Sequence, residues 1–457
     1  MLSLVHRLCV PRLCVIGATL AALAGHARAG GLVITAGSPR AIGRAGAGTV
    51  GDDGGGALLV NPAAMARRDG ARGQLGAALV DDEISWEPEN GPIARTQSPS
   101  SIVPTGAVIG SLGSWVIGVG VMTAAVSERS LTPPADFPPG ELGDRFEFRY
   151  AGIAGGLRRD TVTAGVARRI GDALAVGLAV SASRVAVSER RRMWAGFGGR
   201  DTIGSPTQDI EVAMSGRDAF VPGAALGVLI APEDASLELG ASVGWSHGVR
   251  VDADFVGFGV PDGPTVQRAS PSASLELRQP WALRAGARYL SERFVFELGG
   301  DLWTVPASAE VATWQVRHVS VVDKSGLELP LRQVPSRISQ RTHGAIRGAL
   351  DVEIFSGFLW ATAGYAYAVG GVSGSRQSPT FGDLGGHTVA FGLEATTGGF
   401  TVTAGWSRTW SSTIRPASEL ALDNPFQAGD QACPPGAYDG SIDQLGILID
   451  AELEAPN

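Results

Sequence analysis

Residues 236–251 read SLELGASVGWSHGVRV and alternate strictly between two kinds of side chain. A period of two residues is that of a β-strand whose two faces meet different surroundings. One face therefore suits hydrocarbon and the other suits water. The first face consists of Leu237, Leu239, Ala241, Val243, Trp245, His247, Val249 and Val251, and the second of Ser236, Glu238, Gly240, Ser242, Gly244, Ser246, Gly248 and Arg250.

The same alternation recurs at 174–181, 281–289, 346–354 and 445–453. The composition agrees with it, because 64 of 457 residues are glycine, 44% are apolar and only 18% are charged. That balance argues against a cytosolic multi-domain enzyme. The net charge of −8 argues against a nucleic-acid partner, which would need a basic surface.

The links between the alternating stretches differ in length in a regular way. A soluble all-β protein is the alternative, but its connections need not alternate in length. Short turns on one side and long loops on the other are typical of an outer-membrane barrel. The tight links are 111–114, 170–173, 232–235, 291–293, 355–357 and 397–399, and the long ones include 129–144, 193–209 and 415–437.

Counting the strands predicts an all-β, closed antiparallel transmembrane barrel. Closure is required because hydrocarbon offers no partner to the backbone groups of an open edge. The count is fourteen, and an even number places both chain ends on the periplasmic side. A further strand within 304–322, or a total of twelve or sixteen, stays open. The expected strands begin at Ala71, Ile102, Trp115, Phe146, Leu174, Glu211, Ser236, Ser274, Glu292, His343, Phe358, His387, Phe400 and Ala437.

A transmembrane helix is the rival explanation for 96–127, which contains no charged residue. Pro104 and repeated glycines interrupt this stretch, and the sequence SLGS at 111–114 is a turn signal. We therefore expect a β-hairpin there.

The N-terminus predicts export. Arg7 and Arg12 precede the apolar run 13–23, and Ala27-Arg28-Ala29 has the small residues of a secretory cleavage site. A membrane anchor would need about 20 apolar residues, and this run is shorter. The predicted organisation is a signal peptide at 1–29, a hatch that plugs the lumen at 30–70, and the barrel at 71–457.

The segment 30–70 shows neither strand alternation nor a helical stripe, and it is rich in glycine. Pro62 keeps Asn61 out of helical geometry and suits the first position of a short helix. We expect this compact segment to fold back inside the barrel.

The run 41–65, AIGRAGAGTVGDDGGGALLVNPAAM, resembles the N-terminal hatch of the FadL/TodX family of outer-membrane transporters for fatty acids and other hydrophobic compounds. The resemblance implies a fourteen-stranded barrel, a plugging hatch, and a kinked third strand that opens a lateral exit. The matching residues are Gly43 and Arg44, the pair Asp52 and Asp53, and Asn61 with Pro62 directly before the first strand.

The resemblance also implies that the extreme N-terminus contributes to a ligand pocket. Family members usually present an aromatic residue there. This chain has Leu32, Val33 and Ile34 instead, and their aliphatic side chains suit an alkyl tail.

Arginines on inward faces are the other candidate ligand contacts. Arg284 and Arg288 share one inward face, and Arg347 lies inward on the next strand but one, beside Asp351 and Glu353. An arginine without a carboxylate partner can hold a fatty-acid head group by paired hydrogen bonds. The alternative is a structural ladder of charges across the lumen.

The sequence predicts no catalytic residue, metal site or cofactor. The pattern G-x-S-x-G occurs at 244–248, but it requires a strand-to-helix turn, whereas Ser246 lies in an alternating strand and His247 points to its other face. The mature histidines are scattered singly, and Cys433 is the only mature cysteine, so no intramolecular disulfide can form. For Asp52 and Asp53, hydrogen-bonded turn residues are preferred over cation ligands.

We therefore expect a channel, and not an enzyme, in the outer membrane of a Gram-negative bacterium, passively admitting long-chain fatty acids or other hydrophobic molecules. A general aqueous porin and a structural or adhesive barrel are the alternatives. The expected partners of this monomer are hydrophobic ligands, outer-membrane lipids and the barrel assembly machinery, although the chain ends at Asn457 without the usual aromatic signal. The run 190–192, three arginines, is expected at the outer end of a strand, where it can pair with lipopolysaccharide phosphates.

Overall fold

The computed structural model describes residues 38–67, 69–88, 93–131, 148–196, 206–259, 263–307, 310–323, 325–416, 426 and 436–453. The predicted signal peptide and the residues Leu32, Val33 and Ile34 lie outside these ranges, as does Cys433.

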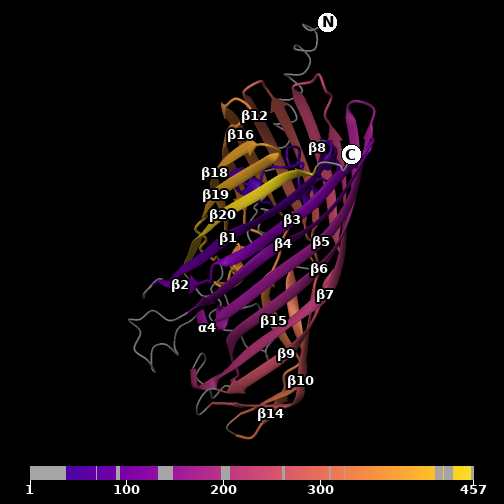
Figure 1. The fold of residues 1–457 in the computed structure, drawn as a ribbon. Helices are drawn as coiled ribbons and strands as arrows, with labels where there is room; N and C mark the ends of the chain where they lie inside the picture. Colours follow the sequence, from indigo (N-terminus) through magenta and orange to yellow (C-terminus); the bar gives the residue numbers. More distant parts are fainter. Residues whose placement is uncertain are drawn as a thin grey trace.

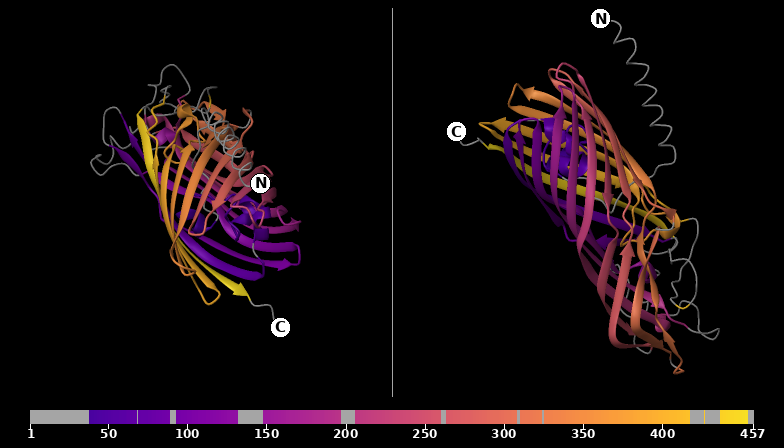
Figure 2. Two further views of the ribbon diagram at one scale, coloured as in Figure 1. Left: turned by 90° about the horizontal axis from the view of Figure 1, so that it is seen from above. Right: turned by 90° about the vertical axis from the view of Figure 1, so that its right-hand side faces the viewer.

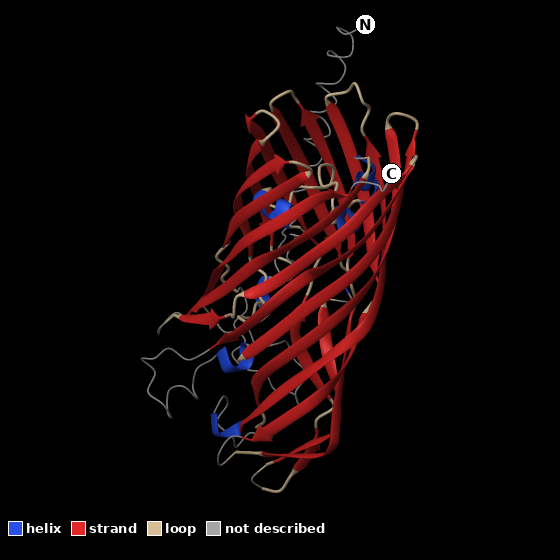
Figure 3. Ribbon diagram, viewed as in Figure 1, coloured by secondary structure: helices blue, strands red, loops and turns tan. Residues whose placement is uncertain are grey.

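Fourteen antiparallel strands form a closed wall, which confirms the predicted barrel (Figures 1 and 3). The first and last strands pair over their whole length, from Ala71 opposite Leu453 to Glu87 opposite Ala437, and so leave no open edge. The wall strands are β1 (Ala71–Glu87), β3 (Ser101–Leu112), β4 (Trp115–Leu131), β5 (Ala154–Ile170), β6 (Leu174–Trp194), β7 (Asp209–Ile230), β8 (Leu237–Ser246), β11 (Trp281–Leu290), β12 (Phe294–Thr304), β16 (His343–Phe355), β17 (Leu359–Val369), β18 (Gly385–Thr397), β19 (Phe400–Ser411) and β20 (Ala437–Leu453).

Tight turns join the wall strands at one end of the barrel, which we call the short-turn end. The β3–β4 link is one of them, so the hairpin expected within 96–127 is confirmed. The opposite, long-loop end carries the remaining strands and the short helix α4 (Phe148–Ala151). That helix occupies part of the strand expected from Phe146, and β5 begins at Ala154 instead. Among the described residues, no helix is long and apolar enough to cross a membrane.

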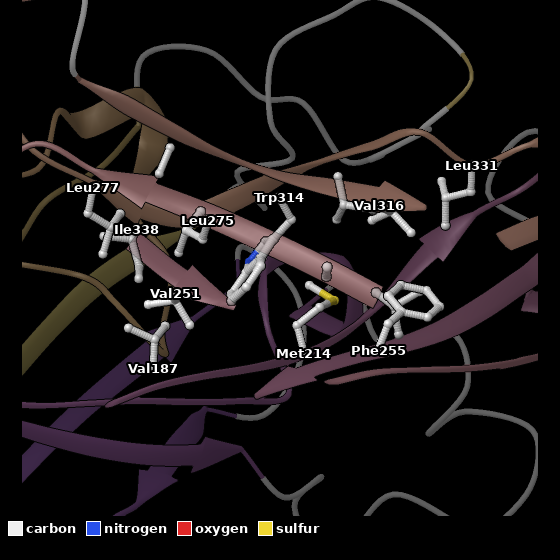
Figure 4. Packing of buried hydrophobic residues seen from close by; sticks show 14 of the residues in the cluster. Val187, Met214, Val251, Phe255, Leu275, Leu277, Trp314, Val316, Leu331 and Ile338 are labelled. Carbon is white, nitrogen blue, oxygen red and sulfur yellow. The ribbon is translucent and has the colours of Figure 1, made fainter. Parts of the chain in front are cut away.

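At the long-loop end the wall continues into a second sheet, which we call the extension. The first half of β7 leaves β8 and pairs with β9 (Val249–Gly259). β10 (Thr265–Leu277) follows β9, then β13 (Val311–Val322), which pairs with both β14 (Glu328–Pro330) and β15 (Gln333–Ser339). The inward side of the extension packs as an apolar cluster around Trp314, Met214 and Leu275 (Figure 4).

The extension corrects two predicted strands. Residues 236–251 form not one strand but two, because the chain leaves the wall at His247 and Gly248 and enters the extension as β9. Likewise, the strand expected from Ser274 is the end of β10, and the wall strand begins at Trp281. The further strand suspected within 304–322 exists as β13, but it belongs to the extension and leaves the wall at fourteen.

The outward face of the wall changes from apolar to charged at one level. On the side of this level nearer the short-turn end, large apolar side chains such as Val162 and Phe220 are more than half exposed, and we call this region the apolar band. The next outward residues toward the long-loop end are charged. Asp160 lies opposite Arg184, Asp218 follows on β7, and the amide of Arg250 donates to Asp218 Oδ2 at 2.8 Å. We call Asp160, Arg184, Asp218 and Arg250 the charged belt.

Residues 38–67, the plug, lie inside the ring of strands near the short-turn end, as the right-hand view of Figure 2 shows in indigo. The plug contains α2 (Pro39–Gly43), α3 (Ala57–Val60) and the 3₁₀ helix η2 (Pro62–Arg67). Its backbone approaches the wall so closely that glycine is required on both sides. A Cβ atom on Gly43 would lie 2.8 Å from the Cα atom of Gly392, and one on Gly364 would lie 2.7 Å from the amide nitrogen of Ala45.

Candidate functional site

A buried arginine joins the plug to the wall. Arg44, which is 3% exposed, donates from Nη2 to Glu297 Oε2 at 2.7 Å and from Nη1 to Asp351. The amide of Val50 donates to the other oxygen of Glu297 at 2.9 Å. Glu297 lies on β12 and Asp351 on β16, so the predicted hatch residue Arg44 reaches two wall strands at once.

The two hatch aspartates are held by groups around them. The amide of Gly54 donates to Asp52 at 3.1 Å, and Asp53 pairs with Arg40 at 3.3 Å and with Arg72 at 3.4 Å. Across the described ranges, no three His, Cys, Asp or Glu side chains gather where they could hold a metal ion. These contacts favour the interpretation of Asp52 and Asp53 as hydrogen-bonded turn residues.

Asn61 and Pro62 fix the other end of the plug. Asn61 Nδ2 donates to the carbonyl of Thr49 at 2.9 Å and to that of Val228 on β7 at 3.3 Å. Pro62 then opens η2, which agrees with its expected place at the start of a helix. A Cβ atom on Gly177 of β6 would lie 2.8 Å from the Cα atom of Ala63, so the wall again admits the plug through glycine.

A cavity of about 260 Å³ lies between the plug and a loop that folds inward from the long-loop end. Leu58, Leu59 and Val60 of the plug line it, and Val372 and Asp383 of the inward loop, residues 370–384, also face it. Most of the remaining lining is apolar or small, as expected for a ligand site with few polar groups. These residues include Leu157, Val185 and Ala225 of the wall, and Leu277 and Ile338 of the extension.

The inward loop is anchored by buried polar contacts. Arg129 of β4 donates to the carbonyl of Gly382 and to both oxygens of Asp82, each at 2.8 Å. Asp383 accepts from the amides of Gly371 at 2.6 Å and Gly385 at 3.2 Å. Burial raises the pKa of the Asp383 carboxyl above its ordinary value.

One arginine in the cavity has no carboxylate partner within the described part of the chain. Arg159 of β5 lines the cavity and donates to the hydroxyls of Ser183 at 3.0 Å and Ser246 at 2.9 Å, and to Gln279 Oε1 at 3.2 Å. All three acceptors are neutral. The site therefore holds a cation that no carboxylate of the described residues pairs with.

The sequence reasoning missed Arg159, although a signal existed. Arg159 shares its strand face with Thr161 and Thr163, which marks that face as the polar, lumenal one. In the sequence, the neighbouring Asp160 looks like a partner for Arg159. Asp160 instead belongs to the outward face and pairs there with Arg158.

The three arginines predicted as ligand contacts each lie beside a carboxylate. Arg284 and Arg347 converge on Asp301, at 3.8 Å and 2.7 Å. Arg288 lies 3.4 Å from Glu238. Arg284 alone of the three lines the 260 Å³ cavity. The arrangement is a ladder of charges along the neighbouring wall strands β8, β11, β12 and β16, and a ligand role for these arginines stays a prediction.

The run 190–192 is only partly available to an outer partner. Arg191 is fully buried and pairs with Glu189 at 3.2 Å. Arg190 is half exposed and pairs with Glu211 at 2.5 Å. The predicted contact with lipopolysaccharide therefore rests on fewer side chains than the sequence suggested.

The strand pairing of the wall has a gap beside the cavity, and we call this gap the window. β3 and β4 pair from Leu112 opposite Trp115 only as far as Thr105 opposite Met122. Beyond that point β4 meets the short strand β2 (Ala94–Gln97) at Ser130 and Leu131, so residues 123–129 have no strand partner on this side among the residues that the structure describes. A bulge lies at the same place, and Ala124 and Ala125 line the cavity.

A closed, plugged β-barrel with a cavity in its lumen defines a transmembrane channel protein. The family model described as outer membrane protein transport protein (OMPP1/FadL/TodX) matches residues 20–255, which is more than half of the chain, and the chain belongs to this family. The family resemblance predicted from the hatch is therefore confirmed. Because the family is one of transport proteins, the prediction that the chain is not an enzyme is confirmed as well.

Solved structures with the same fold include a FadL homologue of Pseudomonas aeruginosa, with a TM-score of 0.69 and 14% identity over 93% of this chain and 100% of that one. The toluene transporter TbuX of Ralstonia pickettii has a TM-score of 0.64 and 13% identity, covering 91% and 98% of the two chains. The toluene transporter TodX of P. putida has a TM-score of 0.59 and 13% identity, covering 88% and 95%. The sequence matches no curated protein.

Proposed function

We propose that this protein is an outer-membrane channel of a Gram-negative bacterium for the passive uptake of long hydrophobic molecules that carry an anionic head, long-chain fatty acids first. The apolar band of the wall would lie in hydrocarbon, with the short-turn end toward the periplasm, as is usual for such barrels. The predicted boundaries of the signal peptide and hatch, at 29 and 70, belong to this proposal.

Arg159 is the observation that carries the proposal. It stands in a largely apolar cavity and offers guanidinium donors that face neutral acceptors. A carboxylate head group would supply the missing counter-charge and accept two parallel hydrogen bonds. The alkyl tail would then lie along Leu58, Val60 and Leu277.

The window beside the cavity supplies an exit. A ligand that leaves past Ala124 and Ala125 would pass between β3 and β4 into the membrane and need not cross the plug. An apolar tail favours this route, because each methylene that stays out of water gains about 0.8 kcal/mol. A general aqueous porin would instead need an open lumen, which the plug and its ion pairs occupy.

Leu32, Val33 and Ile34 complete the proposed site. They precede the plug by a few residues and lie outside the described ranges, so their contact with the alkyl tail stays a prediction. Replacing Leu32 and Ile34 by Asp should weaken fatty-acid binding and leave the barrel folded.

The test compares ligands that differ only in the head. Palmitate and hexadecanol would be titrated against the purified protein, Arg159→Gln, and the control Arg168→Gln, which changes an exposed arginine on the same strand. Loss of a hydrogen-bonded charge partner corresponds to about 1.5–3 kcal/mol, so palmitate should bind Arg159→Gln about 10- to 100-fold more weakly, with hexadecanol unchanged. Equal palmitate affinity in a folded Arg159→Gln protein would show that Arg159 holds no head group. Failure of the unaltered protein to bind either ligand would overturn the proposed function itself.

A further inference from the structure

A large concavity of the described protein lies outside the lumen. A groove of about 1110 Å³ runs over the outward face of the extension, across β9, β10 and β13 and toward the residues that join β14 to β15. We call it the outer groove. Its charged and polar lining includes Arg250, Arg268, Arg317, His318 and Arg332.

Three of these arginines form no ion pair within the described ranges. Arg268, Arg317 and Arg332 are all exposed, and among the residues that the structure describes no carboxylate lies within 4.0 Å of any of them. The acids in the groove are engaged elsewhere or stand apart. Glu276 pairs with Arg250, Glu328 accepts from the hydroxyl of Ser320 at 2.5 Å, and Asp252 lies on the β9 side.

The backbone of β13 is distorted so that Arg317 and His318 lie on the same face. Successive residues of a strand point to opposite faces, yet Arg317 and His318 are both exposed, while Val316 and Val319 on either side are both 5% exposed. A bulge between β10 and β13 makes this possible, where the register shifts between Arg268 and Ser272.

His318 and Ser270 have φ angles of 59° and 54° at that bulge. Residues other than glycine rarely adopt this left-handed conformation, and such strain gathers at functional sites. The bulge thus turns what would be an inward position into an additional outward one beside Arg317.

The outer groove begins at the charged belt. Arg250 belongs to both, and from there the groove extends away from the apolar band on the same outward face. With the apolar band in hydrocarbon, the groove lies level with the head groups of the surrounding leaflet. In the outer leaflet of a Gram-negative outer membrane these head groups are phosphorylated saccharides.

We propose that the outer groove binds the phosphorylated saccharide head group of lipopolysaccharide, with Arg268, Arg317 and Arg332 on its phosphates. This inference rests on the proposed location in the outer membrane and is independent of what the lumen carries. The planar guanidinium group matches phosphate by two parallel hydrogen bonds. The carboxylate of Asp252 and the hydroxyl of Ser274, which also line the groove, suit saccharide hydroxyls.

The test measures lipid binding to the full-length protein in detergent, by native mass spectrometry. The variant carries Arg268→Gln, Arg317→Gln and Arg332→Gln. The control carries Arg95→Gln, Arg168→Gln and Arg293→Gln, three exposed arginines outside the groove, so that the net charge is the same. Bisphosphorylated lipid A with its inner saccharide core is the probe, and the same molecule after enzymatic dephosphorylation is the second arm.

The groove variant should bind the phosphorylated probe at least tenfold more weakly than the unaltered protein, and the control should match the unaltered protein. The dephosphorylated probe should bind all three proteins weakly and alike, and millimolar inorganic phosphate should not displace the lipid. Equal retention by the groove variant and the control would overturn the proposal, as would displacement by free phosphate. Palmitate binding by the groove variant should be unchanged, so that failure here and failure of the proposed function are distinguishable.

Discussion

Arg44 of the plug and Glu297 of β12 form an ion pair, with 2.7 Å between Nη2 and Oε2, in which neither side chain is more than 4% exposed. Asp351 of β16 accepts from the same guanidinium group. The glycine-rich backbone around Arg44 brings this cation to the lumen wall, and the two carboxylates hold the plug across the channel.

Replacing Arg44 by Met should release the plug. Removal of one partner from a buried pair costs about 3–5 kcal/mol, because the remaining charge is left uncompensated. The strands should still form the wall, so ion conductance through the purified channel in planar bilayers should rise. Arg408→Met serves as control, since Arg408 is 41% exposed with Asp443 and such pairs contribute at most about 1 kcal/mol. Unchanged conductance of a folded Arg44→Met barrel would mean that the plug is held by other contacts.

Arginine should be tolerated on the outward face between the charged belt and the long-loop end. It should not be tolerated in the apolar band, on the other side of the belt. Leu226 of β7 is 57% exposed in the apolar band, and Ser215 of the same strand is exposed beyond the belt. Leu226→Arg should lower the free energy of unfolding by about 2–4 kcal/mol in lipid, and Ser215→Arg should leave it almost unchanged. Equal effects in a bilayer refolding titration would place the membrane boundary elsewhere.

Filling the window should separate binding from passage. Ala125 is 5% exposed and lines the cavity beside the unpaired part of β4. Ala125→Trp should block the path between β3 and β4, so that uptake of labelled fatty acid by cells falls while the purified protein still binds it. Ala164→Trp, on the exposed outward face of β5, should leave both unchanged. Normal uptake through a folded Ala125→Trp protein would exclude this exit.

The inward loop should be more stable at low pH. Burial raises the pKa of Asp383 in the folded protein, and His343 and Arg129 act against this shift. The folded-state pKa exceeds the unfolded value of about 3.9. The contribution of protonated Asp383 to the stability of the folded state is therefore fully present at pH values below the unfolded pKa. It is lost as pH rises through the folded-state pKa.

Hydrogen exchange at the Gly371 amide, corrected for intrinsic rates, measures this change. The amide should be better protected at low pH than at neutral pH, and Asp383→Asn should remove the dependence. A His343→Gln protein should keep it. If His343→Gln abolished the dependence and Asp383→Asn preserved it, the titrating group would be the histidine.

The barrel itself could be predicted because alternation of side chains is local. Each wall strand shows one apolar and one polar face, whatever its partners. Alternation does not show where a strand changes partner, however. His247 and Gly248 together keep the parity of residues 236–251, so the pattern runs unbroken across the point where β8 leaves the wall and β9 begins.

The site was less predictable because charge compensation is non-local. Arg284 and Arg347 look equally available in the sequence, and only the register of β12 places Asp301 between them. Arg159 shows the opposite case. It stands next to an aspartate in sequence, yet the strand turns that carboxylate to the outward face.

The acceptors of Arg44 follow it by 253 and 307 residues along the chain. Contacts between such distant residues form only after the intervening loop has closed. Arg44 therefore cannot form its two ion pairs until β12 and β16 have joined the wall. The segment that precedes every strand in sequence thus depends for its anchoring on strands that are made long after it.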